Sequence, residues 1–228
     1  MIGTLRESSL HAALKRWYAR PGDRFEQPLA GWVIDLVRPG ESGDLLIEFQ
    51  TGNFAGLRPK LRALAAYPLR LVHPVAARRE IVRVSADGEI LSRRQSPRHG
   101  RVEHVFEELI YIPEDLLRPN FALEVLLIEE EQHWQDDGRG SWRRGHWSVA
   151  ERHLSGVQQS RTFASADDYL ALLPPGLPRP FSNRDLSGAL HIPAVLAGKM
   201  TYTLRAAGLL AAAGKRGREG LFVLAASR

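Results

Sequence analysis

Two stretches in the first quarter of the chain alternate apolar and polar residues in the manner of strands. Residues 33–37 form a β-branched run that Asp35 interrupts, which is typical of a half-buried strand. Residues 45–50 predict a second strand, in which Glu48 and Gln50 lie two positions apart and therefore project from the same face. A carboxylate within an apolar run needs a polar partner. The pattern therefore predicts that the side chains of Asp35, Glu48 and Gln50 point toward a common site.

A helix is expected over residues 58–67, followed by a third strand over residues 69–75 that ends at His73-Pro74. Lys60 shares the buried stripe of this helix, which consists of Leu57, Leu61 and Leu64. Lys60 would stand close to the end of the second strand, within reach of Asp35 and Glu48. The alternative is an amphipathic side chain with packed methylenes and its ammonium in water.

Residues 4–18 predict a first helix, and residues 26–30 a short strand. Glu7 falls on one helical face with the apolar residues Leu10, Leu14 and Trp17. One interpretation is a solvated carboxylate that stabilises the first turn of the helix through the helix dipole, and the other is a functional acid.

The middle of the chain predicts an arginine-rich hairpin over residues 78–101, a helix over 102–110 and strands over 121–130 and 149–162. The arginines could follow a phosphate backbone or form a solvated face, and the sequence leaves both options open.

Residues 133–153 combine aromatic residues with Arg, Gly and His around a hairpin tip at 136–138. Trp134, Trp142 and Trp147, near Arg143 and Arg144, could stack on unpaired bases or pack across strands. The spacing of His133, His146, His153 and Asp137 matches no familiar metal site, so hydrogen-bonded or solvent-exposed histidines are expected.

A segment with four prolines in nine residues, 172–180, predicts a linker. Beyond it we expect helices over 182–190 and 193–207, and strands over 209–213 and 221–224 that flank the basic turn Gly214-Lys215-Arg216-Gly217-Arg218.

The Asp35 strand, the Glu48-x-Gln50 strand, a helix and a further strand resemble the core of the PD-(D/E)xK nuclease superfamily. The resemblance covers about the first third of the chain and implies a restriction-endonuclease-like fold. It also implies that Asp35 and Glu48 bind a divalent metal, Mg²⁺ or Mn²⁺, with Glu7 on the first helix in support. Gln50 stands where the family usually has lysine, and Lys60 could replace that lysine.

The order helix, turn, helix and basic-tipped hairpin at the C-terminus resembles a winged helix-turn-helix domain, whose second helix normally enters the major groove of DNA. The DNA contacts that this resemblance implies are Lys199, Thr201, Tyr202 and Arg205 on the second helix and Lys215, Arg216 and Arg218 on the wing. The alternative is a module that mediates protein contacts.

The predicted fold class is therefore α/β: a restriction-endonuclease-like mixed sheet flanked by helices, a β-rich middle extension and a C-terminal winged helix. The expected domains are a nuclease-like core over residues 1–100, an α+β extension with the Trp/Arg-rich hairpin over 101–172, a Pro-rich linker over 173–180 and the winged-helix-like domain over 181–228.

Composition changes this picture only slightly. A net charge of +5 favours contact with phosphates without requiring it. The absence of cysteine excludes disulfides and thiolate metal sites. Because no apolar run approaches 18 residues, we expect a soluble, cytoplasmic protein without a membrane partner.

The sequence thus predicts a Mg²⁺-dependent deoxyribonuclease that acts on DNA and is bound to it partly through the winged helix. The main alternative is a catalytically inactive nuclease-like protein that binds DNA or has a regulatory role. A third interpretation is a protein–protein adaptor. A homodimer is one option for its assembly.

Overall fold

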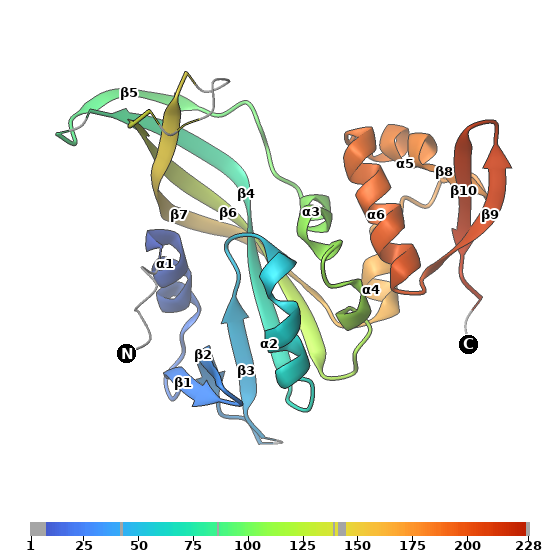
Figure 1. Ribbon diagram of the computed structural model, residues 1–228, viewed down its shortest axis with the longest axis horizontal. Helices are drawn as coiled ribbons and strands as arrows, with labels where there is room; N and C mark the ends of the chain where they lie inside the picture. The colour runs from blue at the N-terminus through green and yellow to red at the C-terminus, as the bar shows by residue number, and fades with distance from the viewer. Residues whose placement is uncertain (1–7, 42, 86, 139, 141–144, 227–228) are drawn as a thin grey trace.

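Two strands of 16 residues, β4 (Leu69–Val84) and β6 (Phe121–Asp136), run parallel through the centre of the computed structural model (Figure 1). The structure describes residues 8–41, 43–85, 87–138, 140 and 145–226. Apolar residues on both faces of β4, such as Leu71 and Val72, are fully buried, which is typical of a central strand covered on both sides.

The large sheet has the order β1-β2-β3-β4-β6-β7, with β5 paired to the far end of β4. Strands β1, β2 and β3 form an antiparallel meander, β3 is parallel to β4, and β6 is antiparallel to β7. The remaining strands of this sheet are β1 (Arg24–Leu29), β2 (Trp32–Arg38), β3 (Leu45–Phe49), β5 (Ile90–Gln95) and β7 (Trp147–Phe163).

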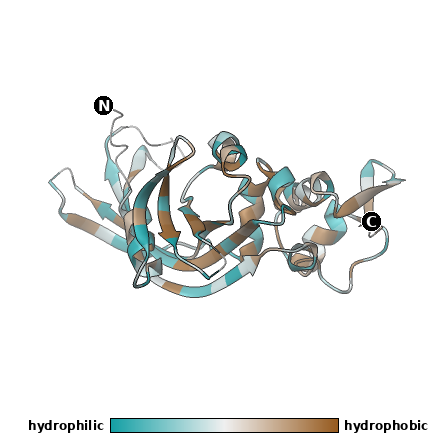
Figure 2. Cartoon of the chain, turned by 90° about the horizontal axis from the view of Figure 1, so that it is seen from below, coloured by the Kyte–Doolittle hydropathy of each residue, from teal (hydrophilic) through white to brown (hydrophobic). Residues whose placement is uncertain are grey.

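Helices cover both faces of this sheet. Helix α1 (Ser9–Tyr18) packs its Leu10 and Leu14 on one face, against Leu36, Ile47 and Val72. On the other face lie η1 (Phe54–Gly56), α2 (Arg58–Ala63), η2 (Val102–Val105), α3 (Phe106–Leu109), η3 (Pro113–Asp115) and α4 (Ala166–Leu170). Figure 2 shows hydrophobic residues interleaved with hydrophilic ones along the strands, as a sheet with differently covered faces requires.

The C-terminal segment adds α5 (Asn183–Leu190), α6 (Ala194–Ala206) and a small sheet of order β8-β10-β9, at one end of the molecule (Figure 1). Its strands are β8 (Phe181–Ser182), β9 (Leu210–Arg216) and β10 (Glu219–Leu224). Helix α6 packs against α3, so Leu196, Met200 and Leu204 share one core with Phe106 and Leu109. The apolar core is therefore continuous across the Pro-rich segment.

The expectation of a mixed α/β sheet flanked by helices is confirmed, with three differences in detail. The strand expected to end at His73-Pro74 continues to Val84. Val72 accepts a hydrogen bond from Gln50 N (2.9 Å), so the backbone of Val72 faces β3. Pro74 is two residues further along β4 and faces the same side, where β3 has already ended. Proline is tolerated there because its missing N–H has no strand partner to bind. No bond of the β3–β4 ladder is lost there.

The second and third differences concern the middle of the chain. Strands β6 and β7 of the predicted extension belong to the same large sheet as β1 to β4. The helix expected over residues 102–110 is divided into η2 and the short α3. None of the helices in the described part of the chain is long and apolar enough to cross a membrane.

Candidate active site

The candidate site lies where strands β2 and β3 separate. Their pairing runs from Arg38↔Leu45 to Leu36↔Ile47, and Asp35 and Glu48 occupy the next positions. Beyond the last pair, the backbone N–H of Phe49 donates to Asp35 Oδ2 at 2.8 Å. The side chain of Asp35 therefore accepts the β3 backbone N–H in place of a β2 carbonyl, and this bond holds Asp35 where β2 and β3 separate.

Helix α1 contributes a second contact to Asp35. His11 Nε2 lies 3.2 Å from Asp35 Oδ2, and because the carboxylate only accepts, the ring nitrogen donates. Sequence reasoning missed His11, although a signal was present: His11 is three residues before the buried Leu14 and therefore on the sheet-facing side of the helix.

Lys60 comes to Glu48 from helix α2. Its Nζ donates to Glu48 Oε2 at 2.6 Å and to the backbone oxygen of Val33 at 2.7 Å. The side chains of Glu48 and Lys60 are 9% and 15% exposed. The other carboxylate oxygen, Glu48 Oε1, is buried and has no hydrogen-bond partner among the described residues. The structure thus brings Asp35, Glu48 and Lys60 together and leaves one buried acceptor unsatisfied.

The two carboxyl groups have different proton affinities. Burial raises the pKa of Glu48 to about 7, the charge of Asp35 adds to this effect, and Lys60 and the backbone N–H of Asp35 oppose it. Burial also acts to raise the pKa of Asp35, but the hydrogen bond and charge of His11, with the Phe49 N–H, outweigh burial and lower it. Neighbouring acids whose pKa values are pushed apart are typical of functional sites.

Gln50 lies one residue beyond β3, and its side chain is bound locally. Its Nε2 donates to Asn53 O at 2.8 Å, and its backbone oxygen accepts from His73 Nδ1 at 2.7 Å. Gln50 is thus near Glu48 in the chain, but among the described residues its side chain forms no hydrogen bond with Asp35, Glu48 or Lys60. Glu7, the fifth predicted residue, lies outside the described residues.

A cavity of about 710 Å³ opens at the end of β3, beginning at Thr51. Its walls include the basic or titratable side chains of His73, Arg79, Arg98, His104 and Arg152, together with Glu107 and Glu108. Of these side chains, Arg79 and Arg152 are ion-paired with Glu130, and Glu48 does not line the cavity.

Four of the seven arginines of the predicted basic hairpin are paired with carboxylates: Arg78, Arg79, Arg93 and Arg101. Arg79 donates to Glu130 and Arg93 to Glu131, both in the acidic run of β6, and the Arg83 guanidinium lies 4.9 Å from the Trp147 ring centroid. These contacts favour a face that stabilises the fold over a strip of free arginines that follows a phosphate backbone. Trp147 packs across strands, and Trp142, Arg143 and Arg144 lie outside the described residues.

The predicted DNA contacts of the C-terminal segment divide into three groups. Thr201 was expected on the outer face of α6, and this is wrong: its side chain is buried, and its hydroxyl donates to Asn183 Oδ1 at 2.6 Å. Arg216 is paired with Asp185 (2.9 Å) and Glu219 (3.2 Å). The exposed or half-buried remainder consists of Lys199, Tyr202, Arg205, Lys215 and Arg218.

Comparison with known proteins identifies a family, but the descriptions of the family and of the relative name no activity. A protein from Treponema pallidum (strain Nichols), described as uncharacterized, is 30% identical over 187 residues, which cover 82% of this chain and 73% of the relative. No solved structure matches the chain. The model of the family described as "Domain of unknown function (DUF8091)" matches residues 8–164, from α1 to the end of β7. The chain therefore belongs to the DUF8091 family.

Proposed function

We propose that this protein is a metal-dependent phosphodiester hydrolase that acts on DNA. One observation carries the proposal: Asp35 and Glu48 stand side by side where β2 and β3 separate, and Glu48 Oε1 is buried without a hydrogen-bond partner among the described residues. An unsatisfied buried carboxylate oxygen costs free energy unless something else binds it.

The order of elements supports the same proposal. An antiparallel meander is followed by helix α2 and then by β4, which is parallel to β3. The acidic residues lie on the second and third strands, as the resemblance to the PD-(D/E)xK superfamily requires. We extend this to a restriction-endonuclease-like core as part of the proposal.

The residues present fit a hard divalent cation. Asp35 and Glu48 offer carboxylate oxygens, which Mg²⁺ and Mn²⁺ prefer over nitrogen or sulfur. Such an ion, when bound, supplies a water of lowered pKa and positive charge against the scissile phosphate. Asp35 and Glu48 would hold it, and the hydrogen bonds from His11 and Phe49 N would keep Asp35 ionised and oriented.

Lys60 fills the role that Gln50 cannot. Gln50 carries no charge, and its amide is bound to Asn53 O. The ammonium of Lys60 is fixed by Glu48 and Val33 O, so its charge is already placed before substrate binds. Preorganised positive charge beside a reacting phosphate stabilises the negative charge of the transition state.

DNA as the substrate rests on the cationic surfaces. Arg98 lines the cavity next to Thr51, and Lys199, Arg205, Lys215 and Arg218 lie on a segment that resembles a winged helix. We retain Arg216 only as a secondary contact, because Asp185 and Glu219 already bind it.

The test is cleavage of single- and double-stranded DNA in the presence of Mg²⁺ or Mn²⁺. Wild-type protein should cut at least one of these substrates, and Asp35→Asn and Glu48→Gln should each lower the rate by about 100-fold or more. Glu89→Gln is the matched control, because Glu89 is an exposed acid of the β4–β5 turn. Cleavage that survives Asp35→Asn, or its absence with both metals, would sink the enzyme proposal.

A second candidate is a nuclease-like protein that binds DNA without cutting it. The bonds of Lys60 to Val33 O and of Gln50 to Asn53 O favour it, because both side chains are satisfied inside the protein. This candidate predicts salt-sensitive DNA binding that depends on Lys199, Arg205 and Arg216 and is unchanged in Glu48→Gln. Calorimetry distinguishes the two, since only the enzyme should lose Mg²⁺ binding in Glu48→Ala.

A further inference from the structure

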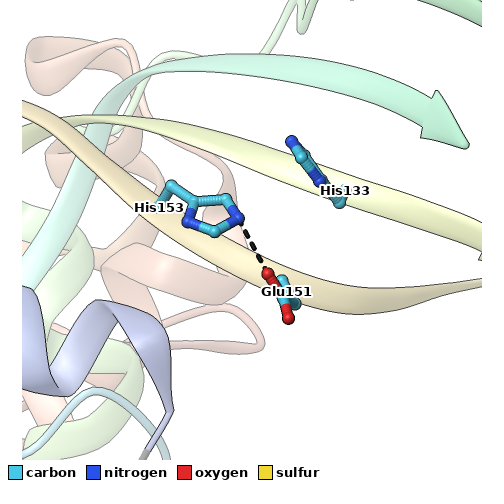
Figure 3. Close-up of side chains that lie close together, drawn as sticks. All are labelled: His133, Glu151 and His153. Atoms are coloured by element: carbon cyan, nitrogen blue, oxygen red, sulfur yellow. Dashed lines mark ion pairs between the residues drawn. The ribbon is translucent and has the colours of Figure 1, made fainter. Parts of the chain in front are cut away.

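The β6–β7 hairpin brings together two histidines that are twenty residues apart in the chain. In the antiparallel pairing, His133 lies opposite Glu151, and Glu131 lies opposite His153. Residues two apart on a strand share a face, so these four side chains form one block on the sheet surface. Figure 3 shows His133 on β6 facing the pair His153 and Glu151 on β7.

The three side chains in Figure 3 offer ligand atoms that converge. One ligand atom from each of His133, Glu151 and His153 lies within 4.8 Å of the other two. The two imidazole rings are 4.7 Å apart between centroids, and His153 Nε2 is 3.0 Å from Glu151 Oε2. A tetrahedral ion with bonds of about 2.0–2.1 Å needs ligand atoms roughly 3.4 Å apart. Small side-chain rotations on this partly exposed surface would shorten the present distances between the ligand atoms to this value.

His133 is also held by a carboxylate in the way that metal-binding histidines commonly are. One of its ring nitrogens, Nε2, is 2.5 Å from Glu131 Oε1. The other oxygen of Glu131 accepts from Arg93 Nη1 at 2.7 Å. A carboxylate on one ring nitrogen orients the imidazole and makes the second nitrogen a better ligand. This arrangement leaves Nδ1 of His133 available for an ion.

We propose that His133, His153 and Glu151 bind a Zn²⁺ ion or a similar transition-metal ion on the surface of the β6–β7 hairpin. Two imidazoles and one carboxylate form a ligand set that suits zinc, with a fourth position for water. The site is chemically distinct from Asp35 and Glu48, whose oxygen ligands suit Mg²⁺. The sequence predicted hydrogen-bonded or solvent-exposed histidines here and no metal site, and it did not single out Glu151, which lies beside the two histidines.

The position of the ion suggests its effect. β7 lies at the edge of the large sheet, and its register with β6 shifts between His133 and Trp134. An ion that links His133 on β6 to His153 and Glu151 on β7 would join the two strands next to this irregularity. Zinc binding should therefore stabilise the hairpin against local opening.

The experiment is titration of purified full-length protein with Zn²⁺, in competition with a chromogenic chelator of known affinity. We expect one tight equivalent in the wild type. Loss of a partner that supports a ligand weakens metal affinity by about 10–100-fold, so His133→Ala and His153→Ala should each weaken it at least as much. Glu131→Gln should produce a loss of about 10-fold, at the lower end of that range.

Two controls keep the result interpretable. His99→Ala removes an exposed histidine elsewhere and should leave affinity unchanged, and Glu48→Gln should also leave it unchanged, which separates this site from the proposed active site. Co²⁺ bound to the wild-type protein should give the strong visible absorption of a four-coordinate ion, and Zn²⁺ should displace it. Wild-type protein without a tight equivalent, or folded His133→Ala and His153→Ala variants that bind Zn²⁺ like the wild type, would overturn the proposal.

Discussion

Two buried glutamates of the same sheet, Glu48 on β3 and Glu130 on β6, have opposite environments. Both oxygens of Glu130 are bound: Oε1 accepts from Arg79 Nε at 2.5 Å and Gln132 Nε2 at 2.8 Å, and Oε2 accepts from Arg152 Nη2 at 2.7 Å. In Glu48, Oε2 accepts from Lys60 Nζ at 2.6 Å, and Oε1 has no hydrogen-bond partner among the described residues.

The difference separates a structural acid from a candidate functional one. The side chain of Glu130 is fully buried and surrounded by donors, so its contacts account for its presence. Glu48 is buried beside the like charge of Asp35, and both effects disfavour its ionised form and raise its pKa to about 7. A residue kept in such a position without full compensation is a candidate for a role outside folding.

The largest expected effect belongs to the structural acid. Glu130→Gln replaces an acceptor by an amide and leaves Arg79 and Arg152 without a counter-charge, so the free energy of unfolding should fall by about 3–5 kcal/mol. Urea denaturation at pH 7 measures it. A loss below about 1 kcal/mol would place Glu130 among ordinary surface acids.

His73 lies on β4, the strand between those that carry the two acids; it donates to Gln50 O and is near Arg152. Burial lowers its pKa to about 4, the charge of Arg152 adds to this, and the Gln50 hydrogen bond opposes it. The unfolded chain takes up this proton near pH 6.5 and the folded chain only near pH 4, so stability should fall as pH drops through this window, by about 3 kcal/mol.

The measurement is urea denaturation at several pH values between 7 and 4, compared with His73→Gln. The variant should show a shallower decline over this window, because it lacks the titrating group. An equal slope in both proteins would show that the pKa of His73 is the same in the folded and unfolded chains.

Lys60→Met tests the pair that holds Glu48. Loss of a buried partner is costly, but Glu48 can take up a proton because its pKa is already about 7. We therefore expect a smaller loss of unfolding free energy than for Glu130→Gln, about 1–2 kcal/mol. Thermal and urea denaturation measure it, and a loss equal to that of Glu130→Gln would make the two pairs equivalent.

Glu48→Gln gives the smallest expected effect on stability. The amide can still accept from Lys60, and the substitution removes a partly unpaired buried charge, so stability should change by less than about 1 kcal/mol. DNA cleavage and Mg²⁺ binding should nevertheless be lost. A large loss of stability with unchanged metal binding would make Glu48 a structural residue like Glu130.

Local features of the sequence were sufficient for much of this fold. The alternation around Asp35 and Glu48 identified β2 and β3, and the stripe of Leu57, Leu61 and Leu64 identified the helix that carries Lys60. These predictions succeeded because each depends on residues within a few positions of one another. His11 was missed because its partner, Asp35, is 24 positions away.

The sequence alone indicated strands β2 and β3 and helix α2 and placed Asp35, Glu48 and Lys60 on them, because periodicity and isolated charges in apolar runs are local properties. Only the tertiary structure decided which strands are neighbours and in which register. It placed β6 beside β4, joined the C-terminal helices to the main core, buried Thr201, and set His133 beside His153. Strand register depends on contacts between distant segments, and a shift of one residue between β6 and β7 would change which residues face His133 and His153.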